Sequence, residues 1–193
     1  TGVGKSTLFK LAMGFLKPSN GSITINGIDV YNISNSEKRK MFGYVNQSFH
    51  MINGTIGDQI SLQDESIKKG QIENALDFVG LTDYVASLEN GIDTQVNNDT
   101  LFSQGQKQLL AIARAIVTDP PILFLDEITA NLDSITEKKF ISVLKKASHA
   151  HTILSITHRM SSMIDCDTVA ILENGMVKNV CSPEALLKND DWY

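Results

Sequence analysis

The first seven residues, TGVGKST, place glycines beside a lysine and hydroxyl side chains. Gly4, Lys5 and Ser6 supply the second half of the phosphate-loop pattern G-x-x-x-x-G-K-[ST]. The backbone amides of residues 2–6 can converge on phosphate oxygens, because glycines such as Gly2 permit the dihedral angles of such a nest. Lys5 would bring a charge to the phosphates, and Ser6 could place a hydroxyl on Mg²⁺. A following helix would add its dipole. The alternative is a glycine-rich turn that only caps a helix.

A second candidate site lies in the stretch ILFLDE, where a short apolar run ends in Asp126 and Glu127. Ligands of open α/β sheets bind at the carboxyl ends of the strands, so these two acids would face the phosphates. Asp126 could hold Mg²⁺ through water, and Glu127 could polarise an attacking water. Solvated acids at the end of a strand are the alternative, because they are common in α/β proteins.

The stretch LFSQGQKQLLAIARAI predicts a buried helix with a strong N-terminal cap. Ser103 and Gln106 have the spacing of a capping box. Residues 109–116 are apolar nearly all round, which requires burial. The N-terminus of this helix, with Ser103 and Gly105, would be an anion site. A well-capped core helix without a ligand is the other interpretation, and the residues alone leave both open.

The remaining patterns predict an α/β fold. Apolar runs at 122–125 and 152–157 are typical of parallel strands buried on both faces, and 42–45 predicts a further strand that leads into Gln47. Residues 8–16 and 135–147 predict helices, and Asn-Gly pairs at 26–27 and 174–175 predict hairpins. Residues 71–80 and 81–88 predict helices with few strand signals between them. We therefore expect a core of residues 1–48 and 119–193, interrupted by a helical subdomain at 49–118.

Composition narrows the functional classes. The net charge is −5, and the lysines and arginines are scattered, so nothing indicates a nucleic-acid surface. No apolar run approaches the roughly 20 residues that span a bilayer. Cys166 and Cys181 have no metal-ligand company, and we expect His50, His149 and His151 on the surface.

Taken together, the motifs resemble the nucleotide-binding domain of an ATP-binding cassette (ABC) transporter over essentially the whole chain. TGVGKST matches the end of the Walker A loop, YVNQSF the Q-loop, FSQGQ the signature L-S-G-G-Q, ILFLDE Walker B, ANLDS the D-loop and SITHR the switch region. The stretches INGTIGDQI and GIDTQV resemble the exporter branch, whose domains are usually fused behind membrane helices. The resemblance implies a P-loop NTPase (RecA-like) core with a mainly parallel sheet and an inserted helical subdomain.

The resemblance also implies roles for single residues, with ATP and Mg²⁺ as ligands. Lys5, Ser6 and Thr7 would contact phosphates and Mg²⁺, while Gln47 would sense the metal or the attacking water and report to the membrane domain. Glu127 would be the catalytic base, and His158 would contact the γ-phosphate. The residues expected to act at a head-to-tail interface with a second such domain, on ATP held by that partner, are Ser103, Gly105, Gln106 and Asp133.

The chain departs from the family pattern at three positions and at its start. Phe102 and Gln104 replace the leucine and the first glycine of the signature, and Asn46 replaces the proline that often precedes the Q-loop glutamine. The family's first strands and its adenine-stacking aromatic would lie upstream of Thr1. We therefore expect a chain truncated inside the Walker A motif, whose isolated fragment hydrolyses ATP negligibly.

Three functions follow from the resemblance. The first is an ATP-hydrolysing engine of a membrane exporter, held at the cytoplasmic face of the cell membrane by a membrane domain outside this chain. The second is a soluble ABC ATPase; the exporter-like stretch after Gln47 argues against it, as does the lack of a basic patch. The third is a regulatory domain that binds ATP with weak hydrolysis, against which Glu127 and His158 argue. The transported substrate is not readable here, because the membrane helices would select it.

Overall fold

A computed structural model describes residues 4–96, 100–128, 134–157 and 166–188. The chain divides into two compact units, one formed by residues 34–155 and the other by the described residues of 1–33 and 156–193. The three-part division at 48/49 and 118/119 stays a prediction.

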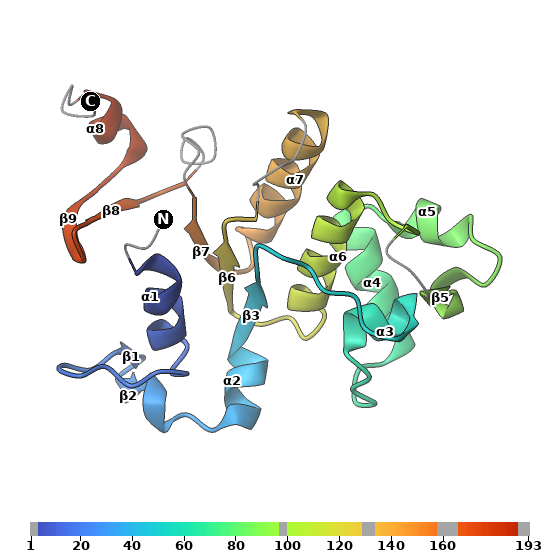
Figure 1. Ribbon diagram of the computed structural model, residues 1–193, viewed down its shortest axis with the longest axis horizontal. Coiled ribbons are helices and arrows are strands. Elements are labelled where there is room, and N and C mark those ends of the chain that lie inside the picture. Colours follow the sequence, from blue (N-terminus) through green and yellow to red (C-terminus); the bar gives the residue numbers. More distant parts are fainter. Residues whose placement is uncertain (1–3, 97–99, 129–133, 158–165, 189–193) are drawn as a thin grey trace. The chain divides into compact units, whose positions relative to one another are not determined.

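The unit of residues 34–155 contains a three-stranded sheet in the order β3–β6–β7 (Figure 1). Its strands are β3 (Phe42–Val45), β6 (Ile122–Asp126) and β7 (Thr152–Ile156). Strands β3 and β6 run parallel, with Phe42 opposite Ile122 and Val45 opposite Leu125. The three predicted strands are therefore present, and β3 pairs with β6 in parallel although the two strands are about 80 residues apart in the chain.

The same unit contains helices and a two-stranded ribbon. The helices of the unit are α2 (Asn35–Met41), α3 (Ile56–Ser61), α4 (Lys69–Val79), α5 (Thr82–Ala86), the 3₁₀ turn η2 (Gly91–Asp93), α6 (Gln104–Ile116) and α7 (Ser134–Ala147). The ribbon, which the sequence did not predict, pairs β4 (Gly54–Thr55) with β5 (Gln95–Val96) in antiparallel fashion. Each of its strands has only two residues, too few for an alternating pattern.

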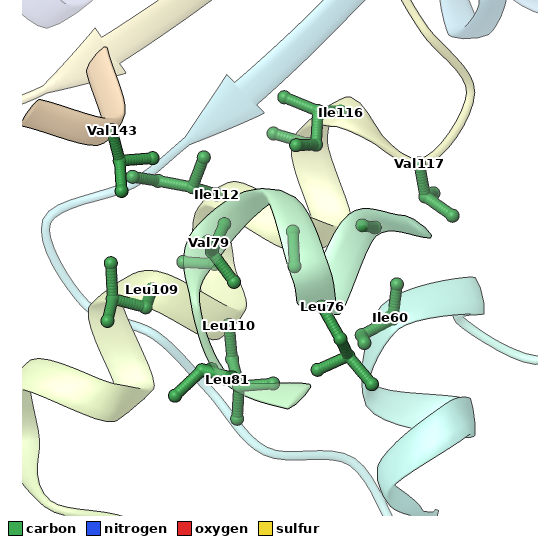
Figure 2. Close-up of a cluster of buried hydrophobic side chains, with 14 of the residues drawn as sticks. Ile60, Leu76, Val79, Leu81, Leu109, Leu110, Ile112, Ile116, Val117 and Val143 are labelled. Carbon is green, nitrogen blue, oxygen red and sulfur yellow. The ribbon is translucent and has the colours of Figure 1, made fainter. Parts of the chain in front are cut away.

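Helix α6 is the centre of the hydrophobic core. The seven apolar residues predicted to be buried are buried: Leu109, Leu110, Ala111, Ile112, Ala113, Ala115 and Ile116. Gln108, which the sequence did not predict to be buried, is buried beside them. Figure 2 shows Leu109, Leu110 and Ile112 gathered with Leu76 and Val79 of α4. The same cluster includes Val45, Leu123 and Leu125 of the sheet, so α6 joins the helical part to the strands.

Strand β7 differs from the expected buried strand. Leu154 is 38% exposed, and Thr152 and Ser155 are exposed as well. Strand β7 ends the row β3–β6–β7, so within the described residues it bonds to β6 on one side only. An apolar run alone does not distinguish such an edge strand from a central one.

His151, just before β7, corrects the expectation of a surface histidine. Its side chain is buried, and Nδ1 donates a hydrogen bond of 2.7 Å to the carbonyl oxygen of Pro120. The imidazole thereby satisfies a buried backbone acceptor at the turn before β6.

The second unit holds the phosphate-loop helix and two hairpins. Its elements are α1 (Lys5–Ala12), β1 (Thr24–Ile25), β2 (Ile28–Asp29), the 3₁₀ turn η1 (Val30–Asn32), β8 (Val169–Glu173), β9 (Met176–Cys181) and α8 (Pro183–Lys188). Both predicted Asn-Gly turns are present: Asn26 and Gly27, like Asn174 and Gly175, all have positive φ. Strands β1–β2 and β8–β9 pair in antiparallel fashion around them.

Helix α1 is shorter than the apolar periodicity predicted. Gly14 has a φ of 67°, and the amide of Phe15 donates to the carbonyl of Lys10 at 2.8 Å. These are the marks of a glycine C-cap, which ends the helix before Phe15 and Leu16. Phe9 and Met13 are the buried hydrophobic side chains of this segment, whereas Phe15 is 59% exposed.

We expect Gly43→Ala to lower the free energy of unfolding by about 1–3 kcal/mol, the usual cost of overpacking a core. A Cβ atom at Gly43 would overlap the Ala115 carbonyl oxygen of α6 and would lie 2.5 Å from Cδ2 of Leu123. The measurement is the denaturant midpoint of the purified protein. Gly70→Ala in α4 is the control, because a Cβ atom there meets nothing within 4 Å. We expect this change to raise the free energy of unfolding by about 0.5–1 kcal/mol, because alanine favours a helix more than glycine does. Equal midpoints for the two variants would contradict the close approach of α6 to β3.

Candidate functional site

The parallel pairing of β3 and β6 brings two predicted motifs to one edge of the sheet. Val45 is opposite Leu125, so the neighbouring strands β3 and β6 end at the same edge. Gln47 lies two residues beyond β3, Asp126 is the last residue of β6, and Glu127 follows it. Crevices at this edge are where open α/β sheets bind ligands. These three residues are the part of the predicted site that the structure brings together.

Asp126 is a buried carboxylate, with 6% of its surface exposed. Its Oδ2 atom accepts a hydrogen bond of 3.4 Å from the hydroxyl of Tyr44 on the neighbouring strand. Burial, and after it the negative charge of Asp126, raise the pKa of the Tyr44 hydroxyl above its usual range. The hydroxyl therefore stays protonated near neutral pH and can donate to the carboxylate. Sequence reasoning missed Tyr44, since 82 residues separate it from Asp126.

Glu127 follows the last residue of β6 with an unusual backbone. Its φ is 51°, in the left-handed region that residues other than glycine seldom adopt. Such strain often occurs where a side chain must be aimed for function. Here it redirects the chain directly after the buried strand, at a half-buried position next to Asp126.

Gln47 has an exposed side chain on a backbone that is held from both sides. Its backbone amide donates a hydrogen bond of 2.8 Å to Oδ1 of Asn46. Its carbonyl oxygen accepts a hydrogen bond of 3.3 Å from Nε2 of Gln108 on α6. Asn46, the departure from the family's proline, thus provides a local acceptor for the next residue. Sequence reasoning missed Gln108 as well, although a glutamine directly before the apolar run of residues 109–113 was a signal.

The N-terminus of α6 has the predicted capping box. The backbone amide of Gln106 donates a hydrogen bond of 3.2 Å to Oγ of Ser103. In return, the backbone amide of Ser103 donates a hydrogen bond of 2.8 Å to Oε1 of Gln106. Ser103 is exposed, so its hydroxyl and the free amides of the first turn are accessible. Phe102, which replaces the signature leucine, is 3% exposed and lies 5.5 Å from the ring of Tyr84. This substitution therefore changes the core rather than the exposed cap.

Gly105 lies against the first turn of α7. A Cβ atom at Gly105 would overlap Cγ2 of Thr136, with Oγ1 of Thr136 at 3.3 Å. The signature glycine is therefore required for the packing of α6 on α7, in addition to any contact with a ligand.

The phosphate loop lies in the other unit, where Gly4 precedes α1 with a φ of 91°. The carbonyl of Gly4 accepts 2.9 Å from the amide of Leu8, which closes the first helical turn. Lys5 is half-buried, and Ser6 and Thr7 are exposed at this N-terminus. A positive φ before a helix is the conformation for which a glycine is needed at this position.

Three predicted site residues, Gly2, Asp133 and His158, lie outside the described residues. Within the described ranges no three His, Cys, Asp or Glu side chains cluster as metal ligands. Nor does any helix there have the length and apolar character that crossing a membrane requires.

Comparison with known proteins gives a consistent picture. A sequence profile described as "ABC transporter" matches residues 1–130. An ATM1-type heavy metal exporter of Novosphingobium aromaticivorans is 35% identical over the whole chain, which covers 32% of that protein. An ATP-dependent lipid A-core flippase of Ralstonia nicotianae is also 35% identical, with 33% of that protein covered. The chain thus spans about a third of the length of these curated relatives.

The same similarity extends to three dimensions. A solved bacterial Atm1-family ABC exporter with ATP bound matches the whole chain with a TM-score of 0.88 and 34% identity, over 34% of that structure. The predicted α/β fold of the P-loop NTPase type is therefore confirmed.

We expect Gly105→Ala to destabilise the protein by about 1–3 kcal/mol through overpacking against Thr136. Thr136→Ser removes the methyl group in the way and keeps the hydroxyl, so the double variant Gly105→Ala/Thr136→Ser should regain most of that loss. Denaturant unfolding of the two single variants and the double variant measures the coupling. Strictly additive changes would show that Gly105 does not contact Thr136.

Proposed function

The chain belongs to the ABC transporter family, and on this premise we propose that it is the ATP-driven engine of a membrane exporter, acting as one of a pair of such domains. The family match confirms the predicted ATP-binding domain of an ABC transporter. The similarity to an exporter and a flippase supports the proposal that it hydrolyses ATP to drive export. The metal, the dimer, the membrane partner and the roles of single residues are part of the proposal.

The observation that supports the proposal most strongly is the sheet edge. Gln47 and the pair Asp126–Glu127 lie where two neighbouring parallel strands end, so we propose that one amide and two carboxylates act on a single ligand. Hydrolysis of a phosphoanhydride needs a positioned water, a base and charge stabilisation. The residue types at this edge can supply the first two.

The phosphates are assigned to the loop before α1. The backbone amides of Gly2 and Gly4, the ammonium group of Lys5 and the hydroxyls of Ser6 and Thr7 would bind them. The helix dipole of α1 would add attraction for the negative charge. Lys5 acts here as a point charge on the outer phosphates.

The donor atoms fit a magnesium ion. Mg²⁺ prefers hard oxygen ligands and keeps several waters, so few protein groups are needed. Asp126 offers a buried carboxylate whose Oδ2 receives one hydrogen bond, from Tyr44, and Ser6 and Gln47 offer a hydroxyl and an amide oxygen. The ion would supply charge neutralisation on the phosphate oxygens.

Glu127 is the proposed general base. Its carboxylate would accept a proton from the attacking water as the water approaches the γ-phosphorus. Gln47 would orient that water, and His158 would contact the γ-phosphate. The strained backbone at Glu127 supports this assignment, because it aims the side chain independently of the strand direction.

A second copy, or a related domain in a heterodimer, would complete each site. Ser103, Gly105 and Gln106 at the N-terminus of α6 would contact ATP held by the partner, with Asp133 at the same interface. The accessible cap of α6 supports this role. Two domains in head-to-tail orientation would then enclose two ATP molecules and separate after hydrolysis.

The membrane partner is inferred from the relatives. Those named above are an exporter and a flippase, of which this chain matches about a third. We propose that a transmembrane domain outside residues 1–193 holds this domain at the cytoplasmic face of the membrane. The acidic net charge of −5 agrees with a function that involves no nucleic acid.

Glu127→Gln should leave ATP binding intact and lower hydrolysis by roughly 10²–10⁴-fold, the usual contribution of a positioned general base. The measurement is phosphate release by the full-length protein, with nucleotide binding assayed in parallel. Glu89→Gln makes the same chemical change at an exposed loop position and should hydrolyse normally. Near-normal turnover of Glu127→Gln would refute its assignment as the base.

Mixed dimers test the action of Ser103 across the interface. A Ser103→Arg chain and a Lys5→Ala chain should each be inactive alone. In a mixed dimer one site carries both lesions and the other carries neither, so part of the activity should return. Differently tagged full-length chains allow the mixed dimer to be isolated before ATPase activity is measured.

The control for this experiment is a mixed dimer of Ser103→Arg with Glu127→Gln, which should recover activity for the same reason. Lys5→Ala mixed with Glu127→Gln should not, because both lesions lie on the same side of the interface and each site then carries one. If no combination restores activity, Ser103 does not act in trans.

A further inference from the structure

The segment that follows β3 is bound to α6 rather than to the sheet. After Gln47 the chain runs through Phe49 and Met51, both of which pack on the core around α6. Two polar side chains of α6, Gln108 and Arg114, contact the backbone of this segment at two points. We call residues 46–53 the Q-segment.

Gln108 makes the first contact. Its side chain is 1% exposed, and Nε2 donates 3.3 Å to the carbonyl of Gln47, across 61 residues of sequence. The amide group has one possible orientation, because rotation by 180° would place its oxygen against the carbonyl oxygen of Gln47. In this orientation Oε1 of Gln108 is buried without a hydrogen-bond partner in the described chain.

Arg114 makes the second contact. Its Nε atom donates 2.6 Å to the carbonyl of Gln59, and its two terminal nitrogens lie 3.4 Å from the carbonyl of His50. The guanidinium group also lies 4.2 Å from the centre of the Phe49 ring. Burial lowers the pKa of Arg114 to about 10, which leaves it charged at neutral pH.

The two contacts differ in what they contribute. Arg114 joins α6 to two carbonyls and a ring, which fits a structural anchor of the Q-segment. Gln108 gains a single long hydrogen bond and leaves an acceptor unsatisfied, a combination that adds little to stability. Buried unsatisfied polar groups are rare in folded proteins, and they often mark function.

We propose that Gln108 is a positioning residue that couples the N-terminus of α6 to Gln47. The inference rests on the proposed function. One continuous helix of 13 residues carries the Ser103 cap at its start and Gln108 in its second turn. A displacement of α6 when the Ser103 end engages the partner's nucleotide would carry the Gln47 carbonyl with it. The side chain of Gln47 would thereby take up its place beside the attacking water.

The proposal separates stability from activity. Gln108→Met keeps the length of the side chain and removes both the donor and the unsatisfied acceptor. Its thermal midpoint should equal or exceed that of the wild type, because a buried unpaired acceptor is lost together with a weak bond. Its kcat should fall by about 2- to 10-fold, the factor that corresponds to one net hydrogen bond, with little change in KM.

A double-mutant cycle with Gln47→Ala is the decisive test. If Gln108 acts only by positioning the Gln47 side chain, Gln108→Met should have no effect on kcat once that side chain is removed. The kcat of Gln47→Ala/Gln108→Met should then match that of Gln47→Ala within about twofold. A role in packing alone would instead lower kcat by the same factor in both backgrounds.

Leu109→Met is the matched control, a volume-conserving change at the adjacent buried position of α6. It should combine additively with Gln47→Ala. The assays use the full-length protein, in which wild-type turnover and its loss in Glu127→Gln are measured first. Failure of those two results refutes the proposed function, whereas the cycle tests Gln108 alone.

Three outcomes would overturn the proposal while the wild type stays active. They are unchanged kcat in Gln108→Met, additive effects in the double variant, and a large drop in the thermal midpoint of Gln108→Met. The last would show that the side chain serves stability.

Discussion

The parallel pairing of β3 with β6 is the constraint on which the candidate site depends. Four residue pairs fix its register, and a shift by one residue would move Gln47 relative to Asp126 and exchange the buried and exposed faces. Gly43 makes this pairing compatible with a buried helix, because a larger residue would collide with the backbone of α6. The close contact between α6 and β3 therefore helps to fix the position of Gln47 relative to Asp126 at the carboxyl edge of the sheet.

Helix α6 contributes polar contacts to the candidate site as well as apolar contacts to the core. Its apolar residues join α4 and α7 to the sheet, and its polar residues contact the parts of the chain that the proposed chemistry needs. Ser103 caps its start, Gly105 packs on α7, and Gln108 contacts Gln47. Because Ser103 and Gln108 lie on one continuous helix, α6 can transmit a displacement from one to the other without a change in its own conformation.

Local sequence signals predicted most of the elements and the types of residue in the site. The Asn-Gly hairpins, the capping box of α6 and the acids at the end of β6 were readable because each depends on neighbours within a few residues. Gly14 was a possible signal for the early end of α1, but the apolar periodicity that continues through Phe15 favoured a longer helix. The exposure of β7 depends on which strands flank it, which no local pattern encodes.

The contacts that orient the site could not be predicted in the same way. Tyr44 contacts Asp126 across 82 residues, Gln108 contacts Gln47 across 61, and Gly105 meets Thr136 on a different helix. Such pairs arise from strand register and helix packing, so they follow from the fold and not from spacing. The family resemblance implied roles for single residues, and the structure adds how several of these residues are held.

The central proposal is that Gln47, Asp126 and Glu127 act on the same ATP whose phosphates Lys5 and Ser6 bind. The most direct measurement is a structure of the full-length Glu127→Gln protein with ATP and Mg²⁺. We expect the γ-phosphate to contact Lys5 of one copy and Ser103 of its partner, with Asp126 beside the metal. A nucleotide whose phosphates contact neither Lys5 nor Asp126, or one that a single copy encloses alone, would contradict the account.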